Sequence, residues 1–258
     1  MGRNPALLLV LFSLLVGLAV ADWNILKQRG WSNGLNLKIS LKNYCESWRI
    51  NVELNNIREF DVVPDECVDY IGKYMTSSQY QVDSERALEQ CTLYLSSSFA
   101  WAGDGKDAWI FDIDDTLLST VPYYKQHHFG GDKLNLSSLE GWLKQCKAPA
   151  LEHTLNLYNE IKGRGLKIFL ISSRREHLRE ATVDNLLKVG YSGWTELILR
   201  VPEDGCQEVQ KYKAEKRKQL IDKGYRIWGI VADQWSSLKG LPTAKRTFKL
   251  PNSLYYVA

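Results

Sequence analysis

The chain has 258 residues, of which 45% are hydrophobic and 24% are charged, and its formal net charge is +3. This length allows one large core, or a core with a smaller subdomain, and the composition is that of an ordinary globular protein. The mild charge, without a basic run that alternates with aromatic residues, argues against a nucleic-acid partner.

The first 21 residues have the features of a secretory signal peptide. Arg3 provides a positive start, residues 6–21 form an apolar stretch that contains Ser13 as its one polar residue, and Ala19-Val20-Ala21 fits the small-x-small cleavage pattern. The apolar stretch is shorter than the roughly 20 residues of a membrane-spanning helix. We therefore expect cleavage before Asp22, a mature protein without a membrane segment, and delivery to the vacuole or the cell exterior. A retained signal anchor is the alternative.

The cysteines and one sequon fit a secreted protein. The five cysteines are Cys45, Cys67, Cys91, Cys146 and Cys206. In an oxidising compartment they would form one or two disulfides, whose pairing the sequence does not give, and the odd number leaves at least one thiol free or paired between chains. Their spacing matches no zinc motif. Asn135-Leu136-Ser137 is a standard glycosylation sequon and predicts an exposed loop.

Residues 22–102 are expected to form an N-terminal extension that packs on the core. Residues 22–43 are rich in Gly and Asn and predict an irregular surface segment. From Trp48 to Leu54 polar and apolar residues alternate, which favours a half-buried strand or an extended arm. Pro64 is expected to begin a helix with Ile71 on its apolar face. Ser84 is typical of the N-cap of a second helix, with Leu88, Cys91, Leu95 and Phe99 on its apolar side.

Residues 103–258 alternate between predicted strands and predicted helices. Short apolar runs predict strands at 108–112, 166–171, 197–199, 225–231 and, at an edge, 247–250. Helices are expected from Pro149 to about Gly163, after a capping box of Ser173 and Glu176, and over 211–223. Such alternation implies right-handed crossovers, so we expect an α/β three-layer sandwich around a central parallel sheet. Residues 119–148 follow the first strand directly and are expected to form a small cap over its end.

Carboxylates and other polar side chains gather where the predicted strands end. Asp112 and Asp114 follow the first strand, Ser172 the second and Asp233 the fourth, and Lys213 lies near the start of a basic helix. Open α/β sheets bind ligands at this edge, and a buried carboxylate without a partner costs several kcal/mol. Phosphoryl transfer through an aspartyl-phosphate needs such a set: a carboxylate nucleophile, a carboxylic acid/base, a metal ion, and a lysine and a hydroxyl for the phosphate oxygens.

These motifs, in this order, resemble the haloacid dehalogenase superfamily of phosphatases. More narrowly, they resemble the plant acid phosphatases and vegetative storage proteins of subfamily IIIB. The most specific segments are 111–119, 212–217 and 224–229, and the resemblance extends over nearly the whole chain after the signal, from Tyr44 to Tyr256.

The resemblance implies a role for each matching position. Asp112 would be the nucleophile and Asp114 the general acid/base. The phosphate-binding residues would be Thr116, which also orders its loop, Ser172 and Lys213. The metal would be Mg²⁺, held by Asp112, the backbone carbonyl of Asp114, and Asp233.

The chain departs from the family pattern at several positions, of which the mildest is Ser172, which stands for a threonine and keeps a hydroxyl. Ser173 and Ala232 replace glycines, and Ser237 replaces the second acid of the fourth motif. Loss of an acid that supports a metal typically costs about 10–100-fold in metal affinity or activity. We therefore expect Ser237 to weaken a phosphatase rather than to abolish it.

Several neighbouring residues have less specific predictions. Asp115 is interpreted as a loop or cap residue, and Arg174 either lies near the phosphate or is a solvated helix-start residue. Lys216 and Lys218 compete with Lys213 for the phosphate. Among the histidines, His127 and His128 fall in the cap, where substrate contact is the alternative to an ordinary surface position, and His153 and His177 are expected on helix surfaces.

Two functions follow from the resemblance. The first is a secreted or vacuolar, Mg²⁺-dependent acid phosphatase that acts on small phosphomonoesters, and the second is a storage protein of the same fold with little or no turnover. Retention of Asp112 together with Asp114, Lys213 and Asp233 favours the enzyme, whereas Ser237 favours storage. A response-regulator receiver domain also places acidic residues and a lysine on a parallel sheet. Such domains normally have no signal peptide, so the secretory start argues against this class. The resemblance leaves open a homodimer, or a heterodimer with a related chain.

Overall fold

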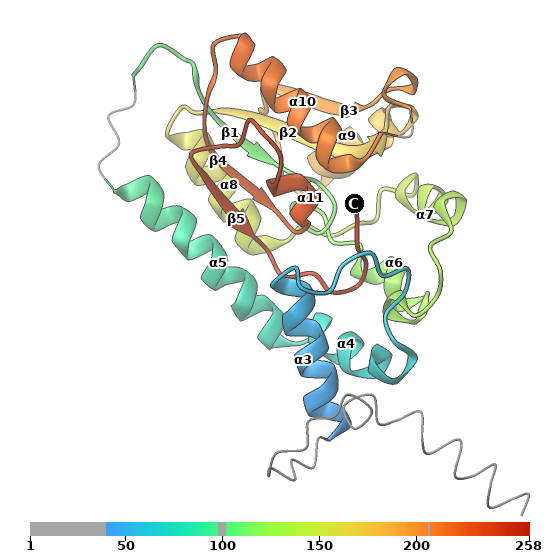
Figure 1. The fold of residues 1–258 in the computed structure, drawn as a ribbon. Helices are drawn as coiled ribbons and strands as arrows, with labels where there is room; N and C mark the ends of the chain where they lie inside the picture. The colour runs from blue at the N-terminus through green and yellow to red at the C-terminus, as the bar shows by residue number, and fades with distance from the viewer. Residues whose placement is uncertain (1–39, 98–101, 206) are drawn as a thin grey trace, which may run out of the picture. The chain divides into compact units, whose positions relative to one another are not determined.

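The computed structural model describes residues 40–97, 102–205 and 207–258 (Figure 1). The predicted signal peptide, most of the segment 22–43, Phe99 and Cys206 lie outside the described residues. Within those ranges, none of the helices combines the length and the apolar character that crossing a membrane requires.

A parallel five-stranded sheet forms the centre, in the order β3-β2-β1-β4-β5. The strands are β1 (Asp107–Phe111), β2 (Lys167–Arg175), β3 (Glu196–Arg200), β4 (Arg226–Ala232) and β5 (Arg246–Lys249). The expected parallel sheet is confirmed, and β5 lies at an edge as predicted. Since β1 is central and its neighbours both run parallel to it, the strand ends that carry the acidic residues meet at one edge.

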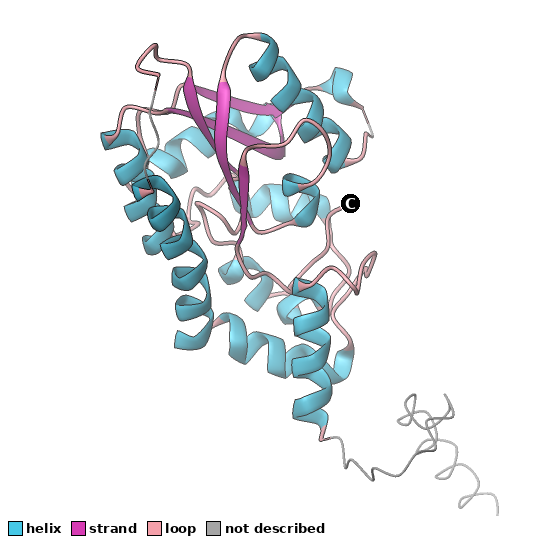
Figure 2. Cartoon of the chain, turned by 60° about the vertical axis from the view of Figure 1, so that its left-hand side comes forward, coloured by secondary structure: helices cyan, strands magenta, loops and turns pink. Residues whose placement is uncertain are grey.

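Helices cover the sheet on both faces (Figure 2). The helices of the N-terminal part are α3 (Leu41–Glu53), α4 (Val68–Met75) and α5 (Ser78–Ser96). Those of the remainder are α6 (Val121–Lys125), α7 (Leu136–Leu143), α8 (Glu152–Gly163), α9 (Arg179–Lys188), α10 (Val209–Asp222) and α11 (Trp235–Leu238). Four short 3₁₀ helices lie in the described connections: Asp65–Cys67, His128–Gly130, Glu176–Leu178 and Pro202–Asp204.

Alternate residues of each strand belong to different cores, because side chains of a strand point to opposite faces. Trp109 and Phe111 pack with α5, α8 and α9 residues in one cluster, whereas Ala108 and Ile110 pack with α10 and α11 residues in the other. The three-layer architecture therefore follows from a strand that is apolar on both faces. Gly229 on β4 makes room for the Trp109 indole, since a Cβ there would lie 2.4 Å from its ring.

The predicted strand or arm at 48–54 is wrong, because residues 41–53 form α3. Cys45, Trp48 and Val52 are the buried residues of this segment, and their spacing of three and four is helical. Ser40 caps the helix, and its Oγ accepts from the Asn43 backbone N–H at 3.2 Å. The alternation of polar and apolar residues was coincidental, and contacts with the rest of the fold decide which of them are buried.

Two predicted helix caps are also wrong. Helix α5 begins at Ser78 with Ser77 as its N-cap, while Ser84 lies inside the helix and donates to the Tyr80 carbonyl at 2.8 Å. The expected box of Ser173 and Glu176 is absent, since β2 continues to Arg175. Serine satisfies its hydroxyl equally well at a cap or on the carbonyl four residues back, so its presence alone does not locate a helix start.

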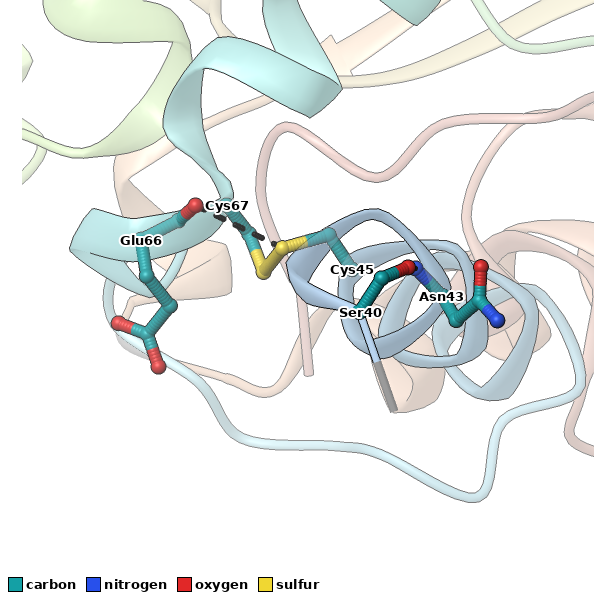
Figure 3. Close-up of a disulfide and its surroundings, with 5 residues drawn as sticks. All are labelled: Ser40, Asn43, Cys45, Glu66 and Cys67. Carbon is teal, nitrogen blue, oxygen red and sulfur yellow. Dashed lines mark hydrogen bonds between the residues drawn. A yellow bond between two sulfur atoms is a disulfide. The ribbon is translucent and has the colours of Figure 1, made fainter. Parts of the chain in front are cut away.

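Cys45 and Cys67 form a disulfide that joins α3 to the turn before α4 (Figure 3). Cys91 is a buried free thiol and Cys146 a half-buried one. The pairing could not be predicted, because it depends on how α3 packs against the following segment.

Asp107 ties the start of β1 to the start of β4. Its Oδ1 accepts from Arg226 Nε at 2.8 Å and from Trp228 Nε1 at 2.7 Å. The Arg226 hydrogen bond lowers the pKa of Asp107 below its ordinary value. The charged form of this carboxylate is thus the one that the fold stabilises.

We predict that Asp107→Asn lowers the free energy of unfolding by about 1 kcal/mol at pH 7 and at pH 5. Because the folded pKa is lowered, this contribution is present above the unfolded value near pH 4 and is lost as pH falls through the folded pKa. Urea unfolding at pH 7, 5 and 3 measures the difference between the two proteins. A difference that persists undiminished below pH 3 would contradict the charge-based explanation.

Candidate active site

The candidate site lies at the carboxyl ends of the central strands. Asp112 follows β1, Asp233 follows β4, and Lys213 comes from α10; all three are buried. They line a cavity of about 410 Å³, together with Asp114 and Ser237. The structure therefore brings together five of the residues that the sequence singled out.

Asp112 is held by a buried lysine and a buried hydroxyl. Lys213 Nζ forms a salt bridge with Asp112 Oδ2, and the side chains of both residues are under 10% exposed. Ser237 Oγ donates to the same Oδ2 at 2.7 Å and accepts from Lys213 Nζ at 2.8 Å. Asp112 Oδ1 accepts the Ile113 backbone N–H at 2.8 Å. These contacts compensate the buried charge and fix the orientation of the carboxylate.

The competing lysines have other partners. Lys216 pairs with Asp204 at 2.9 Å, and Lys218 pairs with Asp222 at 2.6 Å on the exposed side of α10. Of the three lysines that the sequence placed in competition, Lys213 alone lines the cavity.

Asp114 is clamped by Arg174 at the entrance side of the site. The guanidinium donates from Nη2 at 2.7 Å and from Nε at 3.0 Å, one to each carboxylate oxygen, and Nη1 donates to Thr182 Oγ1 at 3.0 Å. The Arg174 side chain is 3% exposed, whereas that of Asp114 is 25% exposed. Arg174 is therefore a buried residue of the site and not a solvated helix-start residue, a choice that the sequence left open.

Asp115 lies in the loop after β1, as expected, but it is fully buried. Its carboxylate accepts from the Thr120 backbone N–H at 2.8 Å, from the Thr120 hydroxyl, and from the Tyr255 hydroxyl at 2.8 Å. Its backbone has a φ of 47°, which aspartate tolerates better than most residues. Burial, followed by the charge of Asp233, raises the pKa of Asp115 to about 7.

Asp233 is fixed by residues from the far end of the chain. Its Oδ2 accepts from Asn252 Nδ2 at 2.7 Å and from Gln234 Nε2 at 3.1 Å, and the Tyr255 hydroxyl lies 3.3 Å away. Burial, followed by the charge of Asp112, raises the pKa of Asp233 to about 6. Asn252 and Tyr255 were missed from the sequence, because nothing local connects them to Asp233.

Thr116 and Ser172 are fully buried beside the site rather than on the cavity lining. Thr116 Oγ1 accepts the Asp233 backbone N–H at 3.1 Å, which holds the two loops together. Ser172 Oγ accepts the Arg174 backbone N–H at 3.2 Å. The first contact is the loop-ordering role foreseen for Thr116, while phosphate contact by either hydroxyl stays a prediction.

Asp112 and Asp233 are the residues best suited to hold a divalent cation. Both are buried carboxylates, and the charge of Asp112 raises the pKa of Asp233, so a cation beside them would relieve this repulsion. Groups of three or more His, Cys, Asp or Glu with metal-binding geometry do not occur among the described residues. A divalent cation such as Mg²⁺ is commonly held by one or two carboxylates with water and other oxygens, so the carboxylates of Asp112 and Asp233 fit an ion of this kind.

The segment 119–148 contributes one wall of the cavity. Tyr124 and four leucines of this segment line it, and the C-terminal residues 255–258 line it as well. His127 and His128 are not among the lining residues; His128 is instead paired with Asp132 at 3.0 Å. Asn135 is exposed at the N-cap of α7, between two of the lining leucines.

The sequence is similar to plant phosphatases and storage proteins. It is 39% identical over 213 residues to "Acid phosphatase 1" of Solanum lycopersicum, with 83% of each chain covered. It is 41% identical to "Stem 28 kDa glycoprotein" of Glycine max, covering 83% of this chain and 84% of that one. "Vegetative storage protein 2" of Arabidopsis thaliana is 40% identical, with 83% and 80% covered.

The fold is shared with a bacterial protein. A class C acid phosphatase from Bacillus anthracis, solved with tungstate bound, superposes with a TM-score of 0.62 at 19% identity, covering 73% of this chain and 85% of that one. Residues 33–258 match the model of the acid phosphatase family known as HAD superfamily, subfamily IIIB. With that match over most of its length and relatives near 40% identity, the chain belongs to subfamily IIIB of the haloacid dehalogenase superfamily, the acid phosphatases.

Proposed function

We propose that this protein is an acid phosphatase that hydrolyses small phosphomonoesters through an aspartyl-phosphate on Asp112, with Mg²⁺ as its cofactor. The observation that supports it most is the buried cluster of Asp112, Lys213 and Ser237 at the floor of an open cavity. A carboxylate held in one orientation beside a buried ammonium group is suited to attack an anionic phosphate.

In the first half-reaction an Asp112 carboxylate oxygen attacks phosphorus. The bond between phosphorus and the ester oxygen breaks, and protonated Asp114 gives its proton to the leaving alcohol oxygen. Lys213 has three N–H donors, so it can bind a phosphate oxygen without leaving Asp112. In the structure both Asp114 oxygens accept from Arg174, which orients the group; protonated Asp114 would keep one oxygen on the guanidinium and direct the protonated oxygen to the leaving group.

In the second half-reaction a water molecule attacks the phosphorus of the aspartyl-phosphate. Asp114 now accepts the proton of this water, the bond between phosphorus and the Asp112 oxygen breaks, and inorganic phosphate leaves. Asp112 is again a carboxylate and Asp114 is again protonated, so the enzyme returns to its starting state.

Asp112, Asp233 and the Asp114 backbone carbonyl are the groups that would hold Mg²⁺. When bound, the ion would reduce the repulsion between the phosphate and the carboxylates of the site. The neighbouring contacts of Asp233 with Asn252 and Gln234 orient its carboxylate for this role.

We infer that the protein works in the secretory pathway, in the vacuole or outside the cell. The disulfide between Cys45 and Cys67 supports an oxidising compartment, where such bonds persist. The exposed Asn135 at the start of α7 is the proposed glycosylation site.

A storage role is the second candidate function. It is favoured by the similarity to storage proteins and by Ser237, which places a neutral hydroxyl beside Asp112. The enzyme is preferred, because a reserve protein has no need of an intact nucleophile, its lysine and a clamped acid/base in one cavity.

We predict that Asp112→Asn lowers the turnover of p-nitrophenyl phosphate at least about 10³-fold, because an amide cannot form the phosphoenzyme. Mass spectrometry after an acid quench should show one phosphoryl group on Asp112 in the parent protein and none in the variant. Asp184→Asn, on the exposed side of α9, is the matched control and should retain activity. Turnover that survives Asp112→Asn would exclude the proposed nucleophile.

We predict that Ser237→Asp increases Mg²⁺ affinity about 10-fold, since it adds a carboxylate beside Asp112. Calorimetric Mg²⁺ titration measures this directly, and the Mg²⁺ dependence of hydrolysis provides a second measurement. Ser237→Ala removes the hydroxyl without adding charge and should not increase the affinity. If Ser237→Asp binds Mg²⁺ no more tightly than the parent, the missing acid does not explain a weakened site.

A further inference from the structure

Helix α7 directs leucines into the cavity. Leu136, Leu139 and Leu143 follow each other at intervals of three and four, which places them on one helix face, and all three line the cavity. Leu143 is 5% exposed, Leu139 packs against the core as a partly buried residue, and Leu136 is 53% exposed. The apolar face of α7 therefore continues from the core into the open site.

The C-terminal residues form a second apolar wall. Tyr255, Tyr256 and Val257 line the same cavity, and Tyr255 is stacked on Tyr124 with ring centroids 5.1 Å apart. The Tyr255 hydroxyl is engaged with Asp115, so the ring is fixed in place. A ligand that reaches up from the acidic floor would meet ring and leucine carbons on its way out.

The three arginines that line the cavity differ in how firmly the protein holds them. Arg174 holds Asp114, and Arg175 lies 3.8 Å from Glu140. The Arg200 guanidinium packs over the Tyr212 ring and donates to a backbone carbonyl. Arg174 is thus committed to Asp114, whereas the Arg175 side chain is 61% exposed and Arg200 Nε has no hydrogen-bond partner among the described residues. The apolar character of the walls therefore comes from the α7 leucines and the C-terminal residues.

We propose that the site selects phosphomonoesters whose alcohol has an apolar body, an aryl or arylalkyl group, over polyol, sugar and nucleoside phosphates. The inference rests on the proposed function and names its substrate class. The phosphate would lie at the floor near Lys213, and the apolar body would lie between α7 and the C-terminal segment. A cavity of about 410 Å³ is within the usual size for small-molecule sites, which run from about 300 to 1,000 Å³.

The test compares kcat/KM for 3-phenylpropyl phosphate, glycerol 1-phosphate and a nucleoside 5′-monophosphate. All three are esters of primary alcohols, so the bond that breaks is similar and the alcohol body is the main difference. We expect the phenylpropyl ester to be preferred at least about 10-fold, the scale on which hydrophobic pockets discriminate. Equal or better hydrolysis of either polar ester would overturn the inference and leave the proposed phosphatase function intact.

Binding tests the inference independently of turnover. Calorimetry should show 3-phenylpropylphosphonate binding at least about 10-fold more tightly than 2,3-dihydroxypropylphosphonate, which carries the same acid on a polar body. Equal affinity for the two overturns the proposed substrate class. Absence of any hydrolysis together with this selective binding would remove the proposed function and retain the apolar subsite.

Two variants test whether the selectivity comes from the leucines of α7 that line the cavity. Leu136→Gln keeps the glycosylation sequon and changes an exposed residue, so folding is preserved; it should reduce the kcat/KM ratio of phenylpropyl to glycerol ester about 5–10-fold. Leu187→Gln makes the same change at a leucine that is 52% exposed on α9, outside the cavity lining, and should leave the ratio unchanged. An unchanged ratio in Leu136→Gln would overturn the placement of the apolar body.

Discussion

The buried ion pair between Asp112 and Lys213 is the constraint around which the site is built. A carboxylate at the end of a central strand has lost its water, and removal from water costs several kcal/mol unless a partner compensates. Lys213 lies 101 residues further along the chain, on α10. The helix must therefore pack closely on the sheet for the pair to form, and the apolar contacts of Tyr212 and Leu220 in the second core hold it there. The site depends directly on this packing.

The C-terminal segment belongs to the site because its side chains contact two further buried carboxylates, those of Asp115 and Asp233. Asp115 and Asp233 are buried and would repel each other, and the Tyr255 hydroxyl lies within reach of both. Asn252 adds a further donor to Asp233. The same C-terminal segment also forms a wall of the cavity. One short segment thus orients the carboxylate proposed to hold the metal and shapes the space that a substrate would occupy.

Prediction from the sequence succeeded where a physical signal is local. The five strands were predicted because each is a short apolar run, and Asp112 and Asp233 were found because charged residues follow such runs directly. It failed at α3, where alternation suggested a strand, and at Ser84, where a serine inside a helix resembled a cap. In both places the side chains that become buried are decided by distant contacts, which override local preference. Arg174 was left undecided for the same reason.

The sequence by itself determined the parallel sheet, the edge at which the acidic residues meet and the family to which the chain belongs. These depend on apolar periodicity and on the order of short motifs, both of which are written along the chain. The tertiary structure alone decided that Lys213, the lysine that the family resemblance favoured, forms an ion pair with Asp112 and that Ser237 contacts the same oxygen. It also decided that α7 and the C-terminal segment contribute apolar walls to the open cavity above them. Each of these is a contact between residues far apart in sequence, and only the packed helices set such distances.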